Sequence, residues 1–104
     1  MSKGFVFLNT YRDSMGTMHQ RDEFIKAIGC DKHNHLILET SWGRRESTPI
    51  LDVEYSGAQV LVTTISGAQY VFNCVSYGTD WSAAADCQQA ARNLCSTIKR
   101  WIEY

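Results

Sequence analysis

A short motif repeated between predicted strands most constrains how this chain can fold. Ser56-Gly57-Ala58-Gln59 recurs ten residues later as Ser66-Gly67-Ala68-Gln69. Each Ser-Gly pair separates two runs of alternating residues, where glycine can adopt the positive φ that a tight hairpin turn needs. A ten-residue period that occurs only twice is too short for a solenoid repeat. The motif therefore predicts consecutive antiparallel strands joined by tight turns.

Hydrophobic periodicity predicts the remaining elements. Runs rich in Val, Ile, Thr and aromatic residues indicate strands, at residues 5–8, 35–42, 50–55, 59–65 and 69–77. A capping box formed by Thr17 and Gln20, followed by apolar residues at helical spacing, predicts a short helix over residues 18–28. An apolar stripe after a cap at Thr79 or Asp80 predicts a C-terminal helix of about 22 residues.

The order of these elements is β-α-β-β-β-β-α, which indicates an α+β fold. At 104 residues the chain is the size of one domain, so we expect residues 1–104 to form an antiparallel meander with both helices packed on it. The polar run 43–49 is predicted to be a loop. No apolar run approaches the length of a signal-peptide core or a membrane span, so we expect a cytoplasmic protein with no membrane contact and four free cysteines.

The distribution of charge is more informative than its total. The net charge of −1 excludes a strongly basic nucleic-acid binder, but residues 46–91 contain five acidic residues and no Lys or Arg. If Leu51, Val53 and Tyr55 face the helices, Asp52 and Glu54 face outward, and Glu39 joins them from the preceding strand. We expect a small acidic face that suits a positively charged protein partner, with an ordinary solvated sheet face as the alternative.

The strand predicted over residues 69–77 is apolar on both sides. Tyr70, Phe72 and Cys74 lie on one side, and Val71, Val75 and Tyr77 lie on the other. Such a strand is either a central strand between two layers or leaves one apolar side exposed. The second cover is expected to be the short helix, a partner protein or a second copy of the chain.

No motif in the sequence names a reaction or a cofactor. A nucleophile elbow, a phosphate-binding loop and a paired-carboxylate motif are all missing. We therefore expect a non-catalytic binding or inhibitor protein, of the kind that includes immunity proteins and phage anti-defence proteins such as anti-CRISPRs. The expected partner contacts are Glu39, Asp52 and Glu54 on the sheet. Trp42, Arg44 and Arg45, at the loop between the strands over residues 35–42 and 50–55, are also expected contacts.

Two alternative functions remain open at this point. Trp42, Arg44 and Arg45, assisted by Tyr11 and Arg12, could stack a base and contact phosphate, as in nucleic-acid-binding domains. Cys30, His33 and His35 have a spacing acceptable for zinc, with Cys74, His19 or water as the fourth ligand. The zinc set lacks the second paired motif that makes zinc signatures specific.

Overall fold

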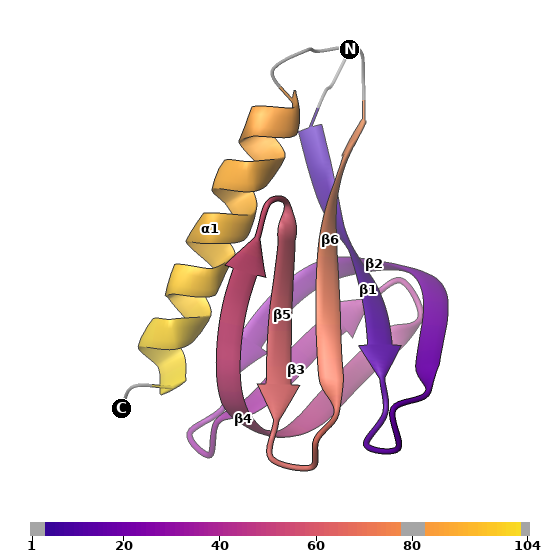
Figure 1. Cartoon of the computed structure of the whole chain (residues 1–104), viewed down its shortest axis with the longest axis vertical. Helices are drawn as coiled ribbons and strands as arrows, with labels where there is room; N and C mark the ends of the chain where they lie inside the picture. The colour runs from indigo at the N-terminus through magenta and orange to yellow at the C-terminus, as the bar shows by residue number, and fades with distance from the viewer. Residues whose placement is uncertain (1–3, 78–82, 103–104) are drawn as a thin grey trace.

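Six antiparallel strands close into a barrel, and one helix follows them (Figure 1). The computed structural model describes residues 4–77 and 83–102. Each strand pairs with the next along the chain, and β1 also pairs with β6, which closes the barrel. The elements are β1 (Gly4–Arg12), β2 (Met18–Cys30), β3 (His35–Thr40), β4 (Gly43–Ser56), β5 (Gln59–Thr64), β6 (Gln69–Tyr77) and α1 (Ala83–Ile102).

The two Ser-Gly turns are confirmed as the hairpins of a meander. Gly57 has a φ of 60° between β4 and β5, and Gly67 has a φ of 88° between β5 and β6. Side chains other than glycine rarely adopt this conformation, so the two glycines permit the tight reversals. The register then aligns Val62 with Tyr70 and Val53 with Val62, which brings the apolar residues of three strands to the barrel interior.

Helix α1 completes the hydrophobic core. It packs against β4, β5, β6 and β1 and lies beside the C-terminal half of β4, where β3 no longer pairs with that strand (Figure 1). The predicted apolar stripe is confirmed over the described turns, where Ala91, Cys95 and Ile98 are buried in one cluster with the barrel interior. The expected caps, Thr79 and Asp80, lie outside the described residues. In residues 83–102, α1 is not apolar enough to cross a membrane.

The predicted helix over residues 18–28 is wrong, because these residues belong to β2. Glu23, Ile25 and Ile28 face the interior, whereas Phe24 is 47% exposed. The register against β3 shifts between Ile25 and Ala27. Such a β-bulge adds one residue, so the inward-facing residues on either side of it are three apart rather than two. The bulge reproduces the i, i+3 spacing of a helix, which explains the error.

A second bulge, in β4, changes which side chains face outward. The predicted loop over residues 43–49 is the first half of this strand, paired with β3. Between Ile50 and Asp52 the register against β5 shifts. Ile50 and Val53 therefore face the core, and Leu51, expected to face the helices, is 64% exposed. Asp52 and Glu54 are exposed as expected.

Candidate functional site

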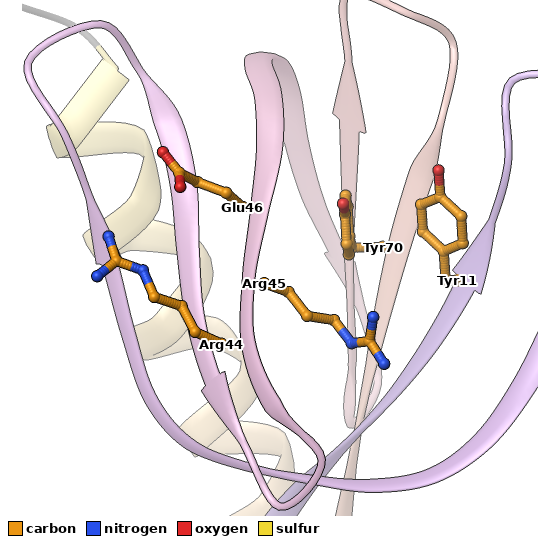
Figure 2. A pocket seen from close by; sticks show the side chains of 5 residues that line it. All are labelled: Tyr11, Arg44, Arg45, Glu46 and Tyr70. Carbon is orange, nitrogen blue, oxygen red and sulfur yellow. The ribbon is translucent and has the colours of Figure 1, made fainter.

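A pocket of about 270 Å³ opens between β4 and the β1–β6 pair (Figure 2). We name it the mouth pocket, and its lining residues are Tyr11, Arg44, Arg45, Glu46 and Tyr70. Arg45 extends toward the two tyrosines, whereas Arg44 and Glu46 extend to the other side of β4 (Figure 2). This alternation follows from the strand, since Arg45 pairs with the buried Leu38, and Arg44 pairs with the exposed Glu39.

Arg45 is held by a carboxylate inside the barrel. Its Nε donates to Oε1 of Glu23 at 2.7 Å, and Glu23 is fully buried. The amide of Asn9, also buried, lies 3.4 Å from the same oxygen. Burial acts to raise the pKa of Glu23, but the hydrogen bond and charge of Arg45, with further hydrogen bonds from Thr40 and Asn9, outweigh it, and the pKa lies below its ordinary value. Glu23 is therefore a charged group that fixes the Arg45 guanidinium.

Two tyrosine rings form the other wall of the mouth pocket, and a histidine ring lies behind one of them. The Tyr11 and Tyr70 centroids are 5.0 Å apart, in directly paired positions of β1 and β6. The His19 ring lies 5.7 Å from Tyr11 on its β2 side. Nε2 of His19 is 3.0 Å from Oδ2 of Asp13, and this contact with His19, followed by the backbone N–H of Thr17, holds the pKa of Asp13 below its ordinary value. The position of Tyr11 is therefore set from both neighbouring strands.

The residues expected to bind nucleic acid are brought together only in part. Arg45 and Tyr11 face each other across the mouth pocket, and Arg44 contributes to its rim. Trp42 is 66% exposed at the β3–β4 turn, and Arg12 is exposed at the end of β1. The structure adds Tyr70, Glu23 and Asn9, which sequence reasoning missed. A signal was available for Asn9, which directly follows the apolar run over residues 5–8. Glu23 ends the polar run over residues 20–23, so nothing in the sequence marked it as buried.

The three carboxylates of the expected acidic face do not lie together. Glu39 pairs with Arg44 across β3 and β4, so a cation offsets its charge locally. Asp52 lies eight residues beyond Arg44 on β4, about 26 Å along an extended strand. Asp52 and Glu54 instead share the outward side of β4 to β6 and of the turn after β5. We name this surface the outer face; it comprises Leu51, Asp52, Glu54, Leu61, Thr63, Ile65 and Val71.

The expected zinc ligands also separate. Cys30 packs against the core, while His33 is exposed. His35 instead forms a group with Asp31 and Glu46, whose potential ligand atoms all lie within 4.8 Å of one another. Backbone N–H groups of His35 and His33 donate to Asp31 and, with the nearby imidazoles, lower its pKa. The group is partly exposed. The contacts of Asp31 with His35 are those of an ordinary turn, and Glu46 approaches them from the neighbouring strand.

Cys74, considered as a fourth zinc ligand, faces the helix rather than Cys30. Burial, together with a hydrogen bond and the charge of Cys87, raises the pKa of Cys74 to about 12. At pH 8 roughly one such thiol in 10⁴ is a thiolate, the form that reacts with alkylating agents. We expect iodoacetamide at pH 8 to leave Cys74 unmodified in the native protein and to modify it fully in denaturant, as measured by peptide mass spectrometry. Equal labelling of Cys74 in both states would contradict its packing against Cys87.

No protein-family profile, curated protein or solved structure matches the chain significantly. Function is therefore inferred from the outer face and the mouth pocket.

Proposed function

We propose that the protein is a non-catalytic, cytoplasmic binding protein whose outer face docks a positively charged protein surface. The observation that carries the proposal is the exposure of two large apolar side chains beside two carboxylates. Leu51 is 64% exposed at the β4 bulge, directly before Asp52, and Ile65 is 62% exposed two residues after Thr63, which pairs with Asp52. Exposed apolar residues with a polar rim are typical of protein-binding surfaces.

Charge determines which kind of partner fits the outer face. Between Arg45 and Arg92 the sequence contains no Lys or Arg, and among the described residues neither Asp52 nor Glu54 forms an ion pair. Arg92 of α1 lies nearby, over the ring of Tyr55, but the two carboxylates of the outer face are not ion-paired with it. Their negative charge attracts a cationic surface and accelerates association with it. In a two-fold dimer through this face, the same carboxylates would approach their own copies. A basic partner is for this reason favoured over a second copy.

The apolar outer side of β6 agrees with this proposal. Val71 is half-buried and Val75 is 40% exposed, while Tyr70 and Phe72 fill the core on the other side. The short helix that was expected to cover the second side is strand β2, and α1 packs on the interior instead. Of the two remaining covers, a partner protein and a second copy, the charge of the outer face favours the partner protein. Occupying the basic surface of another protein would make the chain an inhibitor of the anti-defence or immunity type.

The test compares matched charge reversals on and off the outer face. We expect Asp52→Lys with Glu54→Lys to weaken the partner complex at least tenfold, because like charges across an interface cost several kcal/mol. Glu39→Lys is the control, since Glu39 lies beside Arg44 and away from the outer face. The partner is captured in the native host through a photo-crosslinking residue at position 63, and affinities are measured by calorimetry at two salt concentrations.

The chemistry of the captured partner decides the outcome. The proposal requires a cross-linked segment rich in Lys or Arg, and an affinity that falls with salt and with the double reversal but not with Glu39→Lys. A partner held equally well by the doubly reversed variant would remove the outer face from the interaction. Self-association of the chain through position 63, seen by sedimentation, would replace the basic partner by a second copy.

A further inference from the structure

The mouth pocket is not used by the proposed docking surface and is a separate feature. We propose that it binds one unpaired guanine-type base, a flat heterocycle with two adjacent hydrogen-bond acceptors. In this assignment Arg45 donates to the acceptor pair, and the rings of Tyr11 and Tyr70 pack against the base. The inference is independent of the outer face, because the pocket lies in the half of β4 that pairs with β3.

The Arg45 guanidinium is oriented so that its outer edge is available. Its Nε is occupied by Glu23 at 2.7 Å, and among the described residues Nη1 and Nη2 have no hydrogen-bond acceptor. Figure 2 shows this end of the side chain directed toward the tyrosines. Two parallel N–H donors on a planar group match the O6 and N7 acceptors of guanine, the most common specific contact of arginine with a base. A fixed donor pair of this kind selects ligands by geometry.

The charge balance favours a neutral base over a phosphate group. Glu23 already compensates the positive charge of Arg45 at contact distance. Arg44 and Glu46, which carry opposite charges, both extend to the other side of β4 (Figure 2). A dianion would therefore meet little net positive charge in the pocket, while the Nη donors remain strong hydrogen-bond donors to neutral acceptors. The pocket therefore favours a neutral pair of acceptors over an anion.

The size and walls of the mouth pocket suit a single base. Its volume of about 270 Å³ is just below the range of about 300–1,000 Å³ for sites that enclose drug-sized ligands. Tyr11 is held between Tyr70 and His19, so its ring needs little reordering when a ligand arrives. Stacking of an unpaired base on such rings contributes affinity without regard to sequence, and the arginine then supplies the preference for guanine.

The test measures binding of defined nucleotides to the full chain. We expect calorimetry to show guanosine monophosphate binding about tenfold to a hundredfold more tightly than the adenosine, cytidine and uridine monophosphates. Arg45→Lys keeps the charge beside Glu23 but lacks the two-donor fork, so we expect it to abolish the preference for guanine. Arg92→Lys, at an exposed position of α1 that does not line the pocket, is the matched control and should retain that preference. Thermal melting checks that both variants are folded.

Three results would overturn the proposal: equal affinity for all four nucleotides, competition by inorganic phosphate as effective as that by guanosine monophosphate, or an unchanged preference in folded Arg45→Lys. If Arg45→Lys does not fold, Tyr11→Leu replaces it, and it should lower the affinity for every base at least tenfold. A short single strand with one central guanine, compared with guanosine monophosphate, separates the two sources of the base. Tighter binding of the strand indicates a nucleic acid, and tighter binding of the monophosphate indicates a free nucleotide.

Discussion

Replacing Arg45 with methionine is expected to lower the free energy of unfolding by about 3 kcal/mol, because it leaves the carboxylate of Glu23 buried without its guanidinium. Losing one partner of a buried ion pair typically costs about 3–5 kcal/mol. The lower end applies here, since Glu23 is fully buried but the Arg45 side chain is 31% exposed and water reaches it. Urea unfolding followed by circular dichroism measures the loss.

The double variant Glu23→Leu with Arg45→Met provides the decisive comparison. Apolar residues of similar size remove the desolvation cost of both charges, so we expect this variant to recover most or all of the lost stability. A double variant as unstable as Arg45→Met alone would show that the destabilisation comes from lost packing of the arginine and not from the loss of its ion pair with Glu23.

The same ion pair sets an acid limit on stability. The pKa of Glu23 in the folded protein lies below its ordinary value of 4.5, so the unfolded chain binds the proton first. The contribution of the pair is therefore complete above about pH 4.5 and is lost as the pH falls below that value toward the folded pKa. We expect part of the acid destabilisation of the native protein to be absent from the double variant.

The second large effect is expected from Phe72→Ala, at about 3–5 kcal/mol. Phe72 is fully buried on β6, in the cluster that joins the barrel interior to Ala91, Cys95 and Ile98 of α1. Truncation removes the transfer free energy of the ring and leaves a cavity between two layers that are both packed against it. Against a total stability of about 5–15 kcal/mol for an ordinary domain, this loss is severe.

Val71→Ala is the matched control for Phe72→Ala, because it lies on the same strand but faces outward and is only half-buried. We expect a loss below about 1 kcal/mol there. Both values come from denaturant melts under one set of conditions. Similar losses at the two positions would show that the assignment of the inner and outer sides of β6 is wrong.

Local patterns were reliable wherever the strand kept its two-residue period. The segment over residues 69–77 was placed correctly as a strand with two alternating sides, and the Ser-Gly turns have the positive φ that their glycines predicted. The stripe of α1 that contains Ala91, Cys95 and Ile98 is buried as expected. These features depend on contacts between near neighbours in the chain, which the sequence displays directly.

The errors occur at the bulges. One extra residue near Ile25 gave β2 the spacing of a helix, and the bulge at Leu51 in β4 turned that side chain outward. A bulge is defined by how two strands pair, so a single strand does not reveal it. For the same reason, the sequence did not reveal that Glu39 lies apart from Asp52 and Glu54. The distance between them depends on which half of β4 pairs with which neighbouring strand.

The sequence by itself therefore determined an antiparallel meander with a C-terminal helix, and a cation-free segment with outward-facing acids. Only the tertiary structure decided that the sheet closes on itself by pairing β1 with β6, that Glu23 and Arg45 meet inside it across 22 positions of sequence, and that Tyr11 and Tyr70 form one wall of a pocket. The physical reason is the same in each case. Closure and long-range pairing depend on register between distant strands, and register is set by packing of the whole core rather than by any local pattern.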